Sequence, residues 1–301
     1  MPSPLAPLLA SAPVQGLLNY TLRPLIARLG LSTRVAQWRH RGLRTLLLPR
    51  FWQLPLGTPA VVRRMGIAWQ LDPGECHQWK VWSGTPEEAT QVLAPHLAPG
   101  TLVLDIGANL GQVSLQLAHT AAARGIGPEA LAIWAFEPNP ASLALLETNL
   151  ALNPALQPYI RVWPVGLSDA PGHARLATPD AKHSGLAHVS ATGAVEIELA
   201  RLDDLLARDA VVFEHLLIKA DVEGHELHVL RGAAHTLRTH RPTLVLEVAD
   251  SHLRRARGSA AELISYLRDL GYTEFLDVAT NRPAPTDPAH LNGVFMNLLA
   301  R

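Results

Sequence analysis

Cysteine is almost absent from this 301-residue chain, which has Cys76 alone. A single cysteine excludes an internal disulfide framework and any metal cluster of several thiolates, so we expect a reducing compartment. No run of 18 or more apolar residues occurs, which argues against a membrane-spanning helix. The N-terminus also lacks a charged segment before an apolar stretch, so no secretory signal is expected. These absences predict a cytoplasmic protein.

Acidic residues are missing from positions 1–71, which contain nine Arg and no Asp or Glu. Residues 72–301 hold the other 17 basic residues and all 26 acidic ones, so charges of +9 and −9 sum to zero. This asymmetry predicts at least two functional regions. An apolar fraction of 48% with 17% charged residues excludes a disordered chain.

The pattern of the chain predicts three parts. Residues 1–55 read as a basic extension of short helices broken by Pro, including one over 32–48. Residues 56–98 alternate Pro, Gly and β-branched residues, which predicts one or two hairpins and then a helix over 86–97. We expect this second part to cover the functional site of the third part, residues 99–301.

From Thr101 onward, short apolar runs alternate with amphipathic stretches. This alternation predicts parallel βαβ units, in which a sheet is covered by helices on both faces. The last two strands have no helix between them, which predicts an antiparallel pair at one edge. A polar, His-rich segment over 170–193 is expected to be a mobile lid. The predicted strands are 101–107, 131–138, 159–169, 194–199, 214–224, 241–250, 273–278 and 293–299. The predicted helices are 111–123, 141–153, 225–240 and 259–271.

Ligands of open parallel sheets bind at the carboxyl ends of the strands. The first such end reads DIGANLG, in which Gly107 permits a tight turn and Gly111 permits close packing of the following helix. Asn109 occupies a position that is Gly in dinucleotide-binding loops, and Asp105 precedes the first Gly. Both features disfavour a nicotinamide-dependent oxidoreductase.

Polar residues follow the next two strands. Glu137 comes 26 residues after Gly111, near the interval at which an acid accepts the hydroxyls of a ribose. The alternative is a structural acid at a helix N-terminus. Ser168 and Asp169 either lie at the edge of a bound adenine ring or form an ordinary loop.

Carboxylates also follow the fourth and fifth strands. Asp221, Glu223 and His225 come after Lys219, and Glu247 ends the fifth strand. Such groups serve acid–base chemistry or form a structural salt-bridge cluster around the buried lysine.

In their order, these motifs resemble the FkbM family of class I S-adenosylmethionine-dependent methyltransferases. The resemblance spans residues 86–295 and leaves 1–60 unmatched. It is carried by VLDIGANLGQVS (103–114), AFEPNP (135–140), VGLSD (165–169), ARLDDLL (200–206), IKADVEGHELHVLRGA (218–233) and RPTLVLEV (241–248).

The resemblance implies an α/β fold with a seven-stranded, mostly parallel sheet, helices on both faces and an antiparallel last strand. It also implies S-adenosylmethionine as the cofactor. Its methionyl part, ribose and adenine would be held, in chain order, by Asp105, Gly107, Ala108, Asn109, Gly111, Glu137, Asn139, Ser168 and Asp169.

Members of the family methylate hydroxyl groups on sugars or polyketide-like products, so we expect O-methylation of a small-molecule or glycan acceptor. An alcohol is a poor nucleophile, so a base or a metal must remove its proton. We expect Asp221 to do so, assisted by Glu223, His225 or Glu247. Asp221 and Glu247 could equally hold a divalent metal such as Mg²⁺.

Other functions stay open at this stage. One alternative is a non-catalytic protein of the same fold that binds the cofactor or docks on an anionic surface, and another is the oxidoreductase. The Arg-rich residues 1–64 predict packing against the acidic part, peripheral contact with an anionic membrane or acceptor, or a transit peptide. No nucleic-acid partner is expected. Four tryptophans either form core or cover a substrate mouth: Trp52, Trp69, Trp79 and Trp82.

Overall fold

The computed structural model describes residues 18–28 and 49–301. The helix expected over 32–48 lies outside the described residues. Contacts divide the chain into two compact units. The first comprises residues 1–65, 69–86 and 180–184, and the second comprises 66–68, 87–179 and 185–301. The three-part division expected from the sequence stays a prediction.

The first unit contains a hairpin and a helix after residue 55. The hairpin is formed by β1 (Ala60–Arg64) and β2 (Ile67–Leu71), and the residues of β2 divide between the two units. One hairpin is present, as the expectation of one or two allows, and the turn after Asp72 leads into α6 (Cys76–Ser83), because the Glu75 side chain caps its first turn by accepting from Gln78 N. Before the hairpin lie η1 (Leu18–Leu22), α3 (Arg23–Arg28) and η2 (Phe51–Gln53).

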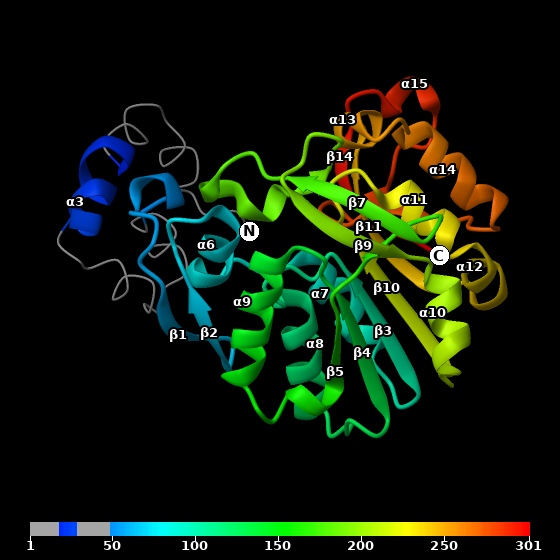
Figure 1. Ribbon diagram of the computed structural model, residues 1–301, viewed down its shortest axis with the longest axis horizontal. Coiled ribbons are helices and arrows are strands. Elements are labelled where there is room, and N and C mark those ends of the chain that lie inside the picture. Colours follow the sequence, from blue (N-terminus) through cyan, green and yellow to red (C-terminus); the bar gives the residue numbers. More distant parts are fainter. Residues whose placement is uncertain (1–17, 29–48) are drawn as a thin grey trace. The chain divides into compact units, whose positions relative to one another are not determined.

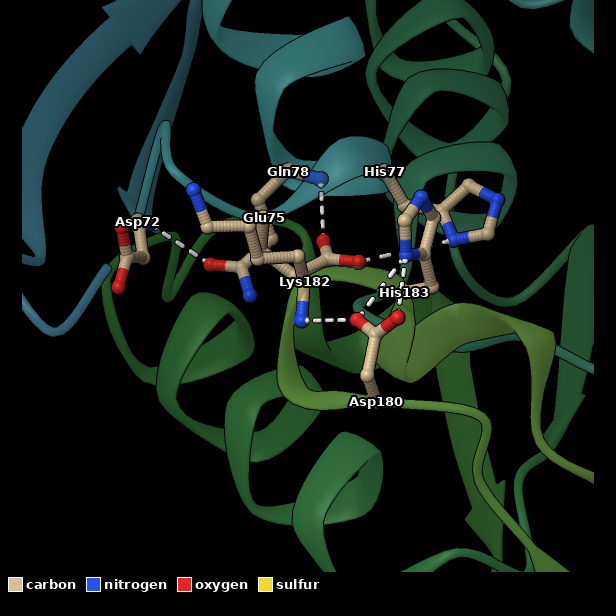
Figure 2. A network of polar contacts seen from close by, with 7 residues as sticks. All are labelled: Asp72, Glu75, His77, Gln78, Asp180, Lys182 and His183. Carbon is tan, nitrogen blue, oxygen red and sulfur yellow. Dashed lines mark hydrogen bonds and ion pairs between the residues drawn. The ribbon is translucent and has the colours of Figure 1, made fainter. Parts of the chain in front are cut away.

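Polar contacts link neighbouring residues in two stretches of this first unit, 72–78 and 180–183 (Figure 2). Gln78 accepts from Asp72 N at 2.7 Å through Oε1, and Glu75 Oε1 lies 4.0 Å from His77 Nδ1. His183 pairs with Asp180 at 2.9 Å. Residues 180–184 belong with the first unit although they come more than 90 positions later, and Lys182 Nζ donates to the carbonyl of Leu54 at 3.4 Å. Of the four tryptophans, Trp69 and Trp82 are buried, which fits core, whereas Trp52 is 56% exposed.

The second unit is built on a mixed sheet (Figure 1). In the described residues it has eight strands, in the order β13-β12-β14-β11-β10-β3-β4-β5. One strand more than the expected seven is present because the short β13 pairs with β12. The expected antiparallel pair is β12 and β14, and β14 lies between β12 and β11 rather than at the edge. The bounds are β3 (Thr101–Ile106), β4 (Leu131–Phe136), β5 (Ile160–Trp163), β10 (His215–Ala220), β11 (Thr243–Ala249), β12 (Phe275–Asp277), β13 (Arg282–Pro283) and β14 (Phe295–Ala300).

Helices cover both faces of this sheet, as the alternating pattern predicts (Figure 1). One face carries a large apolar cluster, in which Leu104 of β3 and Ile218 of β10 join residues of α10, α11, α12 and α14. The other face carries Asp105 and meets α8 through Ser114. The helices are α7 (Glu88–Leu93), η3 (Ala94–His96), α8 (Gln112–Ala123), α9 (Pro140–Ala151), η4 (Gln157–Tyr159), α10 (Leu202–Asp209), α11 (Glu226–Gly232), α12 (Ala234–His240), α13 (Asp250–Arg255), α14 (Ala260–Asp269) and α15 (Pro288–Leu291).

Two predicted elements are divided in the structure. The strand expected over 159–169 breaks after β5, because Pro164 has no N–H to continue a ladder. Its second half, β6 (Gly166–Leu167), joins another sheet. The helix expected over 225–240 is divided into α11 and α12 at Ala233.

The second sheet of this unit occupies much of the segment expected to be a lid. Its four strands lie in the order β6-β9-β7-β8. The segment 170–193 therefore contains strands and the short η5 (Ala181–Leu186) rather than only loop. The bounds of the strands not yet given are β7 (Gly172–Ala177), β8 (His188–Val189) and β9 (Val195–Ala200).

Within residues 18–28 and 49–301, none of the helices has both the length and the apolar character needed to cross a bilayer.

Candidate active site

A buried ion pair lies between the first and fourth strands of the main sheet. Asp105 and Lys219 are register partners on β3 and β10, and Lys219 Nζ lies 3.5 Å from Asp105 Oδ1. Burial alone would lower the pKa of Lys219, but the nearby Asp105, Asp221 and Glu87 raise it above its ordinary value. The lysine is therefore a permanent cation at the carboxyl end of these strands.

This pair shapes the loop that follows β3. Lys219 Nζ donates to the carbonyl oxygens of Ile106 and Gly107, at 3.2 and 2.7 Å. Asp105 Oδ2 accepts from the N–H and hydroxyl of Ser114, at 3.1 and 2.6 Å, which ties the loop to α8. Asp105 is fully buried. Its carboxylate thus holds the loop after β3 against the first turn of α8.

The glycines of this loop have the positions that the sequence predicts. Gly107 has a φ of +78°, and a Cβ there would lie 2.0 Å from the carbonyl oxygen of Asp221. Gly111 has a φ of +88°, and a Cβ there would meet Leu146 at 2.4 Å. Ala108 N and Gly107 N both donate to the carbonyl of Phe136, which holds the loop against the end of β4. Only glycine permits so close an approach at position 107.

Glu137 connects the loops that follow β3 and β4. Its Oε2 accepts from Asn109 N at 2.7 Å, and its Oε1 accepts from Asn139 N at 2.8 Å. Burial raises the pKa of Glu137 to about 7, although the two backbone N–H groups and Lys219 oppose the shift. Each carboxylate oxygen can accept a second hydrogen bond. Both oxygens therefore keep accepting capacity beyond the two backbone bonds.

Asn139 donates its N–H to Glu137 and also caps the next helix. Its side chain caps α9 by accepting from Ala141 N at 3.2 Å. The side-chain cap of α9 is therefore Asn139, whereas Glu137 accepts from the backbone N–H groups of Asn109 and Asn139.

A second polar group lies where β6 ends. Ser168 Oγ lies 3.0 Å from His225 Nε2 and donates to Asp169 Oδ1 at 3.1 Å. His228 Nδ1 lies 3.2 Å from Asp169 Oδ2, and its ring stacks on that of His225. Burial, with help from His228, lowers the pKa of His225 to about 4. His225 is therefore a neutral imidazole in contact with Ser168.

Carboxylates gather where β10 and β11 end. Asp221 follows β10 directly and donates its N–H to the carbonyl of Ile106 at 3.1 Å. Glu226 Oε1 accepts from Val222 N and Gly224 N, at 3.0 and 3.2 Å, so this side chain holds the turn after β10. Burial raises the pKa of Glu226 to about 7.

Glu247 lies among these acids. Burial and the neighbouring Asp221, Glu223 and Glu226 raise the pKa of Glu247 to about 9. His252, at the start of α13, faces two of the acids, since its Nδ1 lies 3.0 Å from Glu223 Oε2 and 3.8 Å from Glu247 Oε2. Ligand atoms of Glu223, Glu247 and His252 all lie within 4.8 Å of one another, which is a spacing compatible with a metal ion.

The structure thus groups the expected site residues into three clusters at one edge of the second unit. Sequence reasoning omitted His252 from the site, because α13 was not predicted and the residue stands five positions beyond Glu247. Two further residues are parts of the site through their contacts: Lys219 and Glu226. The sequence held a signal for each. Lys219 lies in a predicted buried strand and Glu226 lies beside other acids, and a charged group that is buried needs polar partners.

The family of the chain follows from comparison with known proteins. Residues 105–274, more than half of the chain, match the Methyltransferase FkbM domain. The chain therefore belongs to the FkbM family of methyltransferases.

Two curated relatives match part of the chain. Hexuronic acid methyltransferase AglP of Haloferax volcanii is 32% identical over 107 residues, covering 36% of this chain and 43% of the relative. Methyltransferase sdnD of Sordaria araneosa is 30% identical over 168 residues, covering 46% of this chain and 62% of the relative. The chain thus matches less than two thirds of either relative's length.

Among solved structures, Methyltransferase FkbM from Methylobacillus flagellatus KT is similar to this chain. The identity is 15% and the TM-score is 0.44, and the alignment covers 92% of this chain and 60% of the other.

The contact of Gly107 with the Asp221 carbonyl generates a first prediction. Gly107→Ala adds a Cβ 2.0 Å from that oxygen, whereas Gly125→Ala adds one at a similar φ of +74° with no described atom within 4 Å. Both variants carry the backbone strain of an alanine at positive φ. Because of its additional clash, Gly107→Ala should lower the free energy of unfolding by about 1–3 kcal/mol more than Gly125→Ala does. Urea denaturation measures the difference. Equal losses in the two variants would contradict the close contact.

Proposed function

We propose that this chain is an S-adenosylmethionine-dependent O-methyltransferase that acts on a hydroxyl group of a sugar or a polyketide-like product. The observation that carries the proposal is the pairing of Glu137 with the β3 loop. A carboxylate with two available lone pairs stands beside a glycine turn at the carboxyl edge of a parallel sheet. That combination suits the ribose and the methionyl part of the donor.

The chain's residues fit this cofactor. Glu137 would accept the two ribose hydroxyls, and the turn from Gly107 to Gly111 would lie against the methionyl part. Ser168 and Asp169 would stand at the adenine, with His225 supporting Ser168 as a neutral imidazole. When bound, the cofactor supplies an electrophilic methyl group on a positively charged sulfur.

The acceptor side of the proposal rests on the carboxylates beyond β10. The backbone carbonyl of Asp221 lies against Gly107, so this residue would stand beside the methionyl part of the donor. Glu226 is occupied by two backbone N–H groups and is less suited to proton transfer. We assign the base to Asp221, which would take the proton of the acceptor hydroxyl, while the bound donor would supply the methyl group and leave as the neutral thioether.

The acceptor class is supported by one relative's name. The similar protein from Haloferax volcanii is called a hexuronic acid methyltransferase, and a hexuronic acid is a sugar with hydroxyl groups and a carboxylate. A hexuronic acid glycoside is therefore the first acceptor to test.

Donor binding should depend on pH through Glu137. Hydroxyls donate best to an ionised carboxylate, and the pKa of Glu137 is about 7 under the influence of burial, Lys219 and Asp105. Affinity for S-adenosylmethionine should therefore rise up to about tenfold between pH 6 and pH 8 as the carboxylate ionises. Calorimetric titration across this range measures the effect.

The Glu137→Gln variant is the control for that titration. The amide has the same shape but does not ionise, so binding should be weaker and flat over the same range. A variant that keeps the wild-type affinity would remove the ribose assignment.

Turnover should depend on Asp221 without a matching effect on donor affinity. Asp221→Asn keeps the shape of the side chain and removes the base, so methyl transfer should fall by about 100-fold or more while donor affinity stays near wild type. Transfer of labelled methyl to a panel of hydroxylated acceptors measures the rate, with the exposed Asp204→Asn as control. Near-normal turnover in Asp221→Asn would contradict its role. Donor binding with no transfer to any acceptor would favour the non-catalytic alternative.

A further inference from the structure

One cluster at the acceptor side of the site has a donor set that the proposed proton transfer leaves unused. It consists of Glu223 in the turn after β10, Glu247 in β11 and His252 in α13. Two carboxylate oxygens and one imidazole nitrogen from three separate elements converge there. We propose that these three residues form a binding site for a divalent transition-metal ion such as Mn²⁺ or Zn²⁺.

The distances support a shared ion. Protein donors bound to one such ion at about 2.1 Å lie roughly 3–4 Å from one another. His252 Nδ1 lies 3.0 Å from Glu223 Oε2 and 3.8 Å from Glu247 Oε2. All three donor atoms fall within 4.8 Å of one another. The donors are therefore close to ligating positions without any rearrangement of the strands.

Two of the three donor atoms make no hydrogen bond, although His252 Nδ1 lies close enough to Glu223 Oε2 to form an ion pair when the imidazole is protonated. Within the described part of the chain, neither His252 Nδ1 nor Glu247 Oε2 makes a hydrogen bond, although both atoms are buried. Leaving such atoms unsatisfied costs free energy, about 1–3 kcal/mol for each group. A cation placed between them would satisfy both.

The backbone is built to bring the donors together. A Cβ at Gly224 would lie 2.3 Å from the carbonyl oxygen of His252, so glycine lets the turn after β10 press against α13. Glu223 itself has a φ of +55°, in the left-handed region. Glu226 holds the turn through the N–H of Gly224, and Arg255 donates to the carbonyl of Glu223 at 3.0 Å. These contacts hold the backbone that carries the Glu223 ligand, as residues around metal ligands commonly do.

The kind of donor selects the kind of ion. Carboxylates alone suit Mg²⁺ or Ca²⁺, whereas an imidazole among them favours Mn²⁺, Zn²⁺ or Fe²⁺. This set shares Glu247 with the pair expected from the sequence, and has Glu223 and His252 in place of Asp221. Three protein ligands leave room for a further ligand, and, if the proposed function holds, the acceptor hydroxyl would take that position beside Asp221.

The test is metal binding to the whole chain in the absence of donor and acceptor. After treatment with a chelator and its removal, Mn²⁺ is added and the free ion is followed by electron paramagnetic resonance, with Zn²⁺ as competitor. We expect one Mn²⁺ per chain, displaced by Zn²⁺. Glu223→Gln and Glu247→Gln keep side-chain shape, and each should weaken binding by at least the factor of about 10–100 that loss of an outer partner costs.

A control variant makes the result specific. Glu262→Gln removes an exposed acid that pairs with Arg231 on α11, and should leave Mn²⁺ affinity unchanged. Circular dichroism confirms that each variant is folded, and His252→Ala replaces any glutamine variant that is not.

The outcomes separate this proposal from the proposed function. Absence of Mn²⁺ and Zn²⁺ binding, or equal binding by wild type and both glutamine variants, would overturn the metal site even if methyl transfer is observed. One bound ion that is lost in Glu223→Gln and Glu247→Gln would establish the site even if no acceptor is methylated.

Discussion

The site depends on the buried pair formed by Lys219 and Asp105. An ammonium and a carboxylate face each other across neighbouring parallel strands, and each would be costly to bury alone. Both groups also bond to neighbouring residues. Lys219 donates to the carbonyls of Ile106 and Gly107, and Asp105 accepts from the hydroxyl of Ser114. The end of β3, the glycine turn and the start of α8 are thereby held in one arrangement.

From this arrangement the two halves of the site follow. On one side, Glu137 reaches the turn through Asn109 N, which forms the surface proposed for the donor. On the other side, the carbonyl of Asp221 packs against Gly107, which brings the turn after β10 against the β3 loop. The acidic excess of residues 72–301 thus includes a concentrated group at one edge of the sheet. The burial of these acids raises the pKa of Glu137, Glu226 and Glu247.

Much of the second unit was predictable from the sequence, because buried strands and amphipathic helices have different periods. The strands around Leu104, Trp134, Ile218 and Leu246 were predicted in place. The DIGANLG turn was predicted by its glycines, whose positive φ angles the structure confirms at Gly107 and Gly111.

Features set by tertiary contacts were harder to predict. The departure of β6 into a second sheet depends on pairing with β9, a strand about 30 positions away. Helix α6 begins because Glu75 caps it, which periodicity does not reveal. The contact of His252 with Glu223 joins residues on different elements. It requires glycine at 224, because a Cβ there would clash with the backbone carbonyl of His252. The asymmetric charge of residues 1–71 still has only expected roles.

We propose that the Lys219–Asp105 pair shapes a donor site that Glu137 completes. A crystal structure of the chain with S-adenosylhomocysteine would show whether it does. We expect both ribose hydroxyls within hydrogen-bond distance of the Glu137 carboxylate, with the amino-acid end against the turn from Gly107 to Gly111 and the Lys219 bonds to that turn retained. A ribose bound away from Glu137, or a turn released from Lys219 in the complex, would contradict it.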